Sequence, residues 1–246
     1  RALSMAIDRA ILVDAGYGPA GQVTCNVLPA PAVYASTAND WCKTQDVAGA
    51  NKLLDDAGWK RGSDDVRAKD GVRLSLLYQT STNSVRQGTQ ALIKQMWQAI
   101  GVETELKNIS ASVFFGGDQS SPDTFQKNFS DVEMYTNNFN GTDPENYMLR
   151  WTCDKMPSPK TQWIGQNMPR YCDPKYDELA KNLAQTAALE ERALIAKQMN
   201  DMLIEHGAII PLIHRGAVAA HALSLGGVKQ NVWDATPWNI QDWHRK

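Results

Sequence analysis

Apolar residues recur every three or four positions in several stretches of this chain, which is the spacing of a helix that buries one face. The spacing predicts helices over residues 1–13, 47–57, 84–100, 173–183 and 189–205. Residues whose side-chain oxygen can cap a first turn precede three of these stretches: Asp46, Asn83 or Ser84, and Asp173. Glycines at which a helix commonly ends follow three of them: Gly58, Gly101 and Gly207.

Shorter stretches predict strands over residues 73–78, 102–106, 132–135 and 209–213. The first two flank the helix over 84–100, and a strand–helix–strand unit usually joins parallel strands by a right-handed crossover. A further strand, two helices and a last strand follow, so the order of elements predicts an α/β fold. Residues 60–71 are expected to form charged turns. The segments 19–45, 109–128 and 150–172 have no regular period, although short helices are expected near 113–115 and 124–125.

The composition is that of a globular chain, and it narrows the choice of partners. Hydrophobic residues make up 43% of the 246 residues, whereas a disordered chain would have fewer of them and a larger net charge than −2. The 25 Lys and Arg form no runs, so no surface for a nucleic acid is expected. No apolar stretch approaches the roughly 20 residues that span a bilayer. The chain opens at Arg1 on a predicted helix, without Met or a signal peptide, so we expect a processed piece of a longer product.

The four cysteines lie in two of the irregular segments: Cys25, Cys42, Cys153 and Cys172. Although they allow three pairings, we expect the local pairs, because each pair closes a segment that has no period to hold itself. Each closure is worth about 3 kcal/mol in a chain-entropy model. Two disulfides indicate an oxidising compartment such as a periplasm or the cell exterior. The alternative is four buried free thiols in a cytosolic protein.

Motifs of common catalytic, metal and cofactor sites are absent from the sequence. There is no G-x-S-x-G, P-loop or G-x-G-x-x-G, and neither C-x-x-C nor H-E-x-x-H. We therefore predict no cofactor, no metal and no enzymatic activity. A secreted hydrolase that uses Asp143 and Asp173 is the alternative, although Asp143 and Glu145 flank Pro144 as turn and helix-start residues do.

Tryptophan and asparagine side chains occur in the segments that lack a period. They are Trp151, Trp163, Asn137, Asn138, Asn140 and Asn167. Apolar ring faces with a few directed hydrogen bonds are typical of a small-molecule site. Packing beneath a long loop is the alternative interpretation of each Trp.

Five segments, in their order along the chain, resemble one family. They are RALSMAIDRAILVDAGYGPA at 1–20, DVAGANKLLDDAGW at 46–59, RQGTQALIKQMWQAIGVETEL at 86–106, NGTDPENYMLRWTC at 140–153, and the paired helices and strand of 171–216. They resemble the C-terminal half of extracytoplasmic solute-binding proteins of ABC importers, of the dipeptide, oligopeptide and nickel type (family 5). The resemblance covers nearly all of the chain, and the whole protein in that family is about twice as long.

The resemblance implies one lobe of a two-lobed periplasmic binding protein of type II, with a mixed sheet flanked by helices. Residues 1–222 are expected to form the second, C-terminal ligand-binding lobe. Residues 223–246 are expected to form a tail that returns toward the hinge and the missing N-terminal lobe. Two such lobes close on a solute by hinge motion, and the closed form docks on a membrane permease. The expected function is binding of an oligopeptide or related small solute in a bacterial periplasm and its delivery to the permease.

The resemblance also suggests which residues face the solute. In peptide-binding members, an Asp three residues before the acidic–Pro pair holds the α-ammonium of the ligand. The pair here is Asp143-Pro144, and the matching Asn140 is neutral and cannot supply a charge-assisted bond. The expected cleft residues are Asn137, Phe139, Asn140 and Trp163, with Arg86 for an anionic group or, alternatively, as a solvated helix residue. An oligosaccharide or opine-like solute stays open beside the peptide, as does a structural or signalling module that binds no solute.

Overall fold

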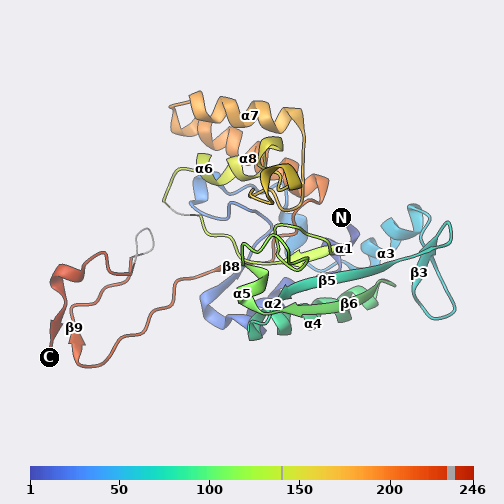
Figure 1. Cartoon of the computed structure of the whole chain (residues 1–246), viewed down its shortest axis with the longest axis horizontal. Helices are drawn as coiled ribbons and strands as arrows, with labels where there is room; N and C mark the ends of the chain where they lie inside the picture. The colour runs from blue at the N-terminus through green and yellow to red at the C-terminus, as the bar shows by residue number, and fades with distance from the viewer. Residues whose placement is uncertain (140, 232–235) are drawn as a thin grey trace.

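The chain forms a body built on a sheet, a group of helices beside it and an extended C-terminal segment (Figure 1). The computed structural model describes residues 1–139, 141–231 and 236–246. The helices are α1 (Ala2–Met5), α2 (Arg9–Gly16), α3 (Val47–Asp56), α4 (Ser84–Gln98), α5 (Ala111–Phe114), α6 (Glu145–Met148), α7 (Pro174–Gln185) and α8 (Leu189–His206). The strands are β1 (Gly21–Val23), β2 (Lys60–Arg61), β3 (Arg67–Lys69), β4 (Val72–Arg73), β5 (Ser75–Ser81), β6 (Glu103–Ile109), β7 (Val132–Met134), β8 (Ile213–Arg215), β9 (Leu225–Gly226) and β10 (His244–Arg245). The predicted α/β class is confirmed.

A parallel sheet with the strand order β6-β5-β7 forms the centre of the body. Tyr78 on β5 lies opposite Leu106 on β6 and Val132 on β7, so these side chains share one face. Helix α4 covers that face with Ile93 and Trp97, and the Trp97 ring lies 5.5 Å from that of Tyr78. The predicted strand–helix–strand unit with parallel strands is confirmed.

Capping residues predicted from the sequence begin their helices in the structure. Asp46, Asn83 and Asp173 each accept a hydrogen bond from a backbone N–H two or three residues further along the chain. Such a bond satisfies one of the N–H groups that a first turn leaves without a helical partner. At the other end of α8, Gly207 has a φ of 78°, a left-handed conformation that ends the helix.

A buried arginine, Arg9, connects the first helices of the chain with the segment near Pro211. In both places the structure differs from the predicted element, the helix over 1–13 and the strand over 209–213. Asp8 caps α2 with an extended backbone, so the helix predicted over 1–13 is divided into α1 and α2. The next residue, Arg9, is buried, and its guanidinium donates to the carbonyls of Ser4 and Pro211. Because the Pro211 carbonyl is used there and proline has no N–H, the strand predicted over 209–213 begins only at Ile213. That strand, β8, pairs with β1.

Two other predictions differ in detail from the structure. The charged segment 60–71 was expected to form turns, but β2, β3 and β4 form a small antiparallel sheet there. Only Arg67 in these strands is buried, so the sequence shows no apolar alternation. Helix α5 matches the short helix expected near 113–115. None forms near 124–125, where the Phe125 N–H instead bonds the distant Phe114 carbonyl.

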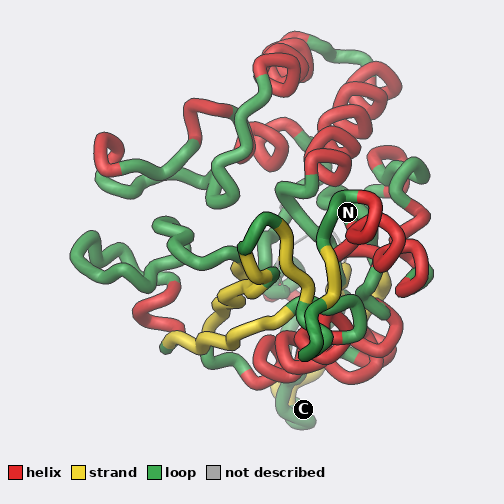
Figure 2. Tube along the Cα trace, turned by 90° about the vertical axis from the view of Figure 1, so that its right-hand side faces the viewer, coloured by secondary structure: helices red, strands yellow, loops and turns green. Residues whose placement is uncertain are grey.

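The group of helices beside the body has its own apolar core. Helices α7 and α8 pack together with α6 through Tyr176, Leu183, Met199 and Leu203. Figure 2 shows these helices set apart from the strands when the molecule is viewed from the side. The two expected disulfides are present, Cys25–Cys42 and Cys153–Cys172. They cross-link the irregular segments 19–45 and 150–172, which adjoin this group of helices. The predicted local pairing is therefore confirmed.

The C-terminal segment extends away from the rest of the chain. After Gly216 it runs outward to a short antiparallel pair formed by β9 and β10 (Figure 1). Val218 and Leu223 on this segment are 79% and 91% exposed. None of the helices in the described parts of the chain is long and apolar enough to cross a membrane.

Candidate functional site

A cleft with a volume of about 1670 Å³ is lined by residues from both the sheet body and the group of helices. Its walls are β7 with the following loop to Phe139, the first turns of α4, and segments near residues 24–30 and 207–218. Within the described residues β7 pairs only with β5, so its other edge is free. The cleft residues Tyr135 to Phe139 follow the carboxyl end of β7, and ligand sites in α/β proteins commonly lie outside the carboxyl ends of the strands.

Aromatic rings form one wall of the cleft. The rings of Phe139 and Tyr147 are 5.5 Å apart, and those of Tyr147 and Trp151 are 5.2 Å apart with their planes nearly perpendicular. Burial raises the pKa of Tyr147 to about 12, so this phenol stays neutral. The indole N–H of Trp151 is buried and has no hydrogen-bond partner within the described residues. The wall therefore offers ring faces and one unused donor.

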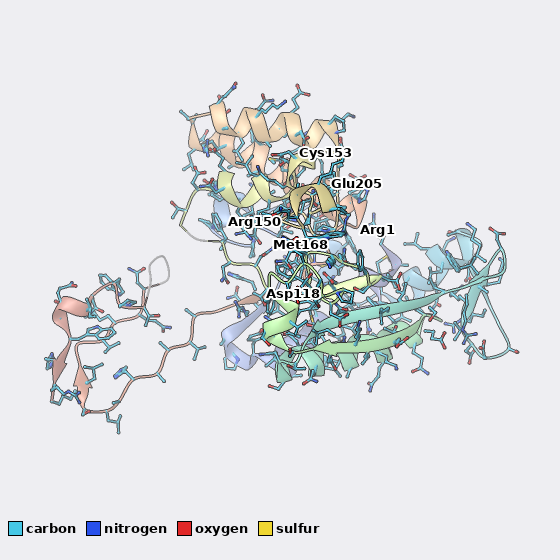
Figure 3. All side chains as sticks on the ribbon, viewed as in Figure 1. Arg1, Asp118, Arg150, Cys153, Met168 and Glu205 are labelled. Atoms are coloured by element: carbon cyan, nitrogen blue, oxygen red, sulfur yellow. A yellow bond between two sulfur atoms is a disulfide. The ribbon has the colours of Figure 1, made fainter. Side chains whose placement is uncertain are left out.

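Three of the residues predicted from the sequence line this cleft: Asn137, Phe139 and Arg86. Asn137 is held by Arg150, whose guanidinium donates to the side-chain oxygen at 3.1 Å. Figure 3 labels Arg150 and Met168 in the region between the sheet and the helices, and Met168 also lines the cleft. Asn140 lies outside the described residues.

Arg86 reaches the cleft from the first turn of α4 and is half-buried there. Its guanidinium donates to Ser81 Oγ at 2.6 Å and lies 5.3 Å from the centre of the Phe115 ring. No ion pair joins it to a carboxylate in the parts of the chain that the structure describes. Burial lowers the pKa of Arg86, Tyr17 raises it and the neighbouring Arg215 lowers it again. Two guanidinium groups thus lie near each other, and neither forms an ion pair with a carboxylate of the described residues, an arrangement that favours an anion.

Trp163 lies apart from this cleft. It lines a second, smaller pocket of about 350 Å³ with Lys127 and Phe129. Its ring is perpendicular to that of Phe129, and the Lys127 ammonium lies 5.4 Å from its centre. The structure therefore does not bring Trp163 together with Asn137, Phe139 and Arg86.

A buried arginine anchors the loop that leads from β7 to α6. One Arg192 nitrogen lies 2.6 and 2.7 Å from the two Asp143 oxygens, and another donates to the Leu183 and Thr186 carbonyls. Asp143 also accepts from the Glu145 N–H, as expected of a turn and helix-start residue. Asp173 caps α7. Both carboxylates considered for a hydrolase thus hold local structure.

Several cleft residues were not found from the sequence. Arg215 is the last residue of β8, and its guanidinium donates to the side-chain oxygen of Asn138 at 3.2 Å. Glu133 lies on β7 between two apolar residues, and such an alternating carboxylate normally faces solvent. Only the sheet register and the covering loop reveal that it is partly buried at the cleft. Among the described residues, no group of three or more His, Cys, Asp or Glu side chains is placed to hold a metal ion.

Comparison with known proteins identifies a family over most of the chain. Residues 1–158 match the sequence model of the bacterial extracellular solute-binding proteins, family 5 Middle. A dipeptide-binding protein of Pseudomonas aeruginosa is 24% identical over 232 residues, which cover 93% of this chain and 39% of that protein. Protein XP55 of Streptomyces lividans is 33% identical over 114 residues, 46% of this chain and 21% of that protein. The chain thus spans well under half the length of these relatives.

Solved structures show the same fold. The oligopeptide-binding protein AppA of Bacillus subtilis, in complex with a nonapeptide, has a TM-score of 0.75 and 18% identity over 100% of this chain and 46% of its own. NikZ of Campylobacter jejuni, in complex with Ni(L-His), has a TM-score of 0.78 and 21% identity over 99% of this chain and 48% of its own. At these identities the likeness concerns the fold alone.

Proposed function

Because the chain belongs to the family 5 bacterial extracellular solute-binding proteins, we propose that it is one lobe of the substrate-binding component of an ABC importer. It binds an oligopeptide or a related small solute in a cleft that a second lobe closes. The closed protein then delivers the solute to membrane permease subunits from the periplasm. Residues 1–222 are the lobe, and residues 223–246 lead back to the hinge.

The cleft between β7 and the helices is the observation that carries this proposal. Its volume of about 1670 Å³ exceeds the roughly 300–1,000 Å³ of an enclosed small-molecule site. Such a volume suits a cleft that is open on one side and becomes smaller when another domain closes over it. The aromatic wall with Phe139 and the amide of Asn137 supply the apolar faces and directed hydrogen bonds that a bound solute needs.

A peptide is supported as the solute by the charge at the cleft and by the relatives. Arg86 and Arg215 provide positive charge that no ion pair with a carboxylate neutralises within the described residues, which suits the carboxylate of a peptide. The Pseudomonas relative is named a dipeptide-binding protein, and AppA holds a nonapeptide. A neutral sugar would leave the positive charge of Arg86 and Arg215 unpaired, so this charge favours a peptide over a sugar.

Ligand identification on the complete protein that carries this chain tests the proposal. The protein is purified natively and denatured, and the released small molecules are identified by mass spectrometry. Thermal shifts with peptide and oligosaccharide libraries are measured alongside, because a bound solute raises the melting temperature by mass action. Release of peptides and stabilisation by peptides are expected. A protein that releases no solute and responds to neither library would overturn the transport function, and a response to sugars alone would replace the peptide by a sugar.

A further inference from the structure

We propose that Glu133 and Asn128 form a subsite in the cleft that binds a positively charged group of the solute, an ammonium or a guanidinium. The inference rests on the proposed function, because it assigns the kind of solute to the same cleft. It concerns Glu133, which lies seven residues before Asn140. Asn140 occupies the motif position and has no charge. The family motif therefore does not supply it.

Unpaired acceptors at the cleft are the first observation. The Glu133 Oε2 atom is buried and has no hydrogen-bond partner within the described residues. The same is true of the Asn128 Oδ1 atom, and both residues line the cleft. Buried oxygens normally have a donor, and an acceptor left alone costs about 1–3 kcal/mol. Both residues lie beside Arg170, which lowers the pKa of Glu133 and donates to the same Met168 carbonyl as the Asn128 amide. Two such oxygens suit a solute group with several N–H donors.

The remaining polar atoms of both side chains are already used, which directs the free oxygens. Glu133 Oε1 accepts from the Gln79 amide at 3.2 Å, and the Asn128 amide donates to the Met168 carbonyl at 3.0 Å. These bonds fix both side chains from the protein side. When Glu133 is ionised, the atoms left over are acceptors, so this form of the site selects a cationic donor.

The cations nearest to Glu133 are engaged elsewhere. Lys107 stands in the same row of the sheet, on the far side of Gln79, and its ammonium pairs with Asp123 at 2.6 Å. Arg170 lies close enough to lower the pKa of Glu133, but it donates to the Lys127 and Met168 carbonyls. No salt bridge of Glu133 is found among the described residues, so an incoming cation breaks no existing ion pair.

Burial makes the protonation of Glu133 depend on what occupies the cleft. It raises the pKa of Glu133 to about 8, with Arg170 opposing the shift. Tyr135, which directly follows β7, stays neutral because burial raises its pKa as well. In the empty cleft the carboxyl is therefore mostly protonated at pH 7. A bound cation favours the carboxylate and releases a proton.

Peptide probes that differ in one charge test the subsite in the complete protein. The probes are Ala-Lys-Ala and Ala-norleucine-Ala, which lacks the side-chain ammonium. Both peptides are also used with an acetylated N-terminus, which removes the terminal ammonium. We expect the unmodified protein to bind at least one cationic probe about tenfold or more tightly than its neutral counterpart. A preference for lysine over norleucine assigns the subsite to a side chain, and loss on acetylation assigns it to the terminal ammonium.

Two variants and a pH series complete the test. Glu133→Gln keeps the acceptor for Gln79 and should abolish the preference for the cation. Glu105→Gln is the control, because Glu105 is exposed on the same face of the sheet and does not line the cleft. Affinity for the cationic probe should rise several-fold from pH 6 to pH 8, and only with Glu133 present.

The outcomes distinguish a failure of this subsite from a failure of the proposed transport function on which it rests. Binding of peptides with no preference for a cation, or a preference that survives in Glu133→Gln, overturns the subsite and leaves peptide transport standing. Failure to bind any of the probes, together with a protein that releases no peptide, overturns both.

Discussion

At the scale of single residues, the cleft concentrates charges that the lobe itself does not neutralise. Arg86 and Arg215 provide positive charge, while Glu133 provides a carboxyl with one oxygen unpaired among the described residues. Unpaired charge in a partly buried place lowers stability and is retained where a ligand uses it. Two predictions follow from these side chains.

Removing the charge of Arg86 should weaken binding of solutes that carry a free carboxylate. A charge-assisted hydrogen bond contributes about 1.5–3 kcal/mol, so Arg86→Gln should lower affinity for a tripeptide by about 10- to 100-fold. The same peptide with a C-terminal amide should bind both proteins equally. Lys94→Gln is the control, since Lys94 is exposed on the same helix and does not line the cleft. Calorimetric titration measures both effects, and an equal loss for acid and amide would contradict the assignment.

Glu133 should make the ligand-free protein less stable as the pH rises. Its pKa in the folded state is about 8, above the ordinary value of 4.5. The stabilisation is thus complete below pH 4.5 and is lost as the pH rises through 8. Because the side chain is partly exposed, we expect Glu133→Gln to be about 2 kcal/mol more stable than the unmodified protein at pH 8 and similar at pH 4.5. Chemical denaturation at several pH values measures this difference, and parallel pH profiles would refute it.

At the scale of elements, the loop from β7 to α6 is positioned by a contact far along the chain. Arg192 on α8 binds Asp143 with one nitrogen and, with another, two carbonyls at the C-terminal end of α7. The arginine side chain is 11% exposed and that of Asp143 is 58% exposed. The two partners therefore differ in what their removal leaves buried.

Replacing either partner of this contact should have unequal effects. Arg192→Met leaves buried carbonyls without donors and should lower the free energy of unfolding by about 2–3 kcal/mol. Asp143→Asn removes an exposed carboxylate and should cost less than about 1 kcal/mol. Urea denaturation of the two variants distinguishes them. Equal losses would mean that the ion pair, and not the carbonyl contacts, carries the stabilisation.

At the scale of the whole molecule, the C-terminal segment presents apolar side chains that no other part of the described chain covers. Leu223 is 91% exposed, Val218 79% and Ile240 60%. When several large apolar side chains are exposed on one segment, a contact with another domain is a common reason. The proposed assignment of residues 223–246 as a connection to a second lobe accounts for this exposure.

Leu223→Ser should therefore destabilise only the complete protein. Burial of a leucine contributes about 1.5–3 kcal/mol, so a loss of about 2 kcal/mol is expected there, whereas the 246-residue chain alone should be unaffected. Leu194→Ser is the control, because Leu194 is 68% exposed on α8. Thermal unfolding of both lengths measures the difference. Equal stability of the complete protein with and without the substitution would remove the basis for the proposed tail contact.

The sequence by itself determined the elements whose signals are local. The caps at Asp46, Asn83 and Asp173, the parallel strand–helix–strand unit, and the local disulfides all depend on residues near one another in the chain. The family was likewise visible in short segments.

Only the tertiary structure decided which side chains meet at the cleft. Trp163 and Asn137 are both loop residues, yet the fold places one in a separate pocket and the other beside Arg150. Arg9 divides the first helix and shortens β8 through Pro211, about 200 residues away. Glu133 is partly buried because of a covering loop, not because of its neighbours in sequence. Burial and pairing are properties of contacts between distant segments, so a pattern of hydrophobic and polar positions cannot encode them residue by residue.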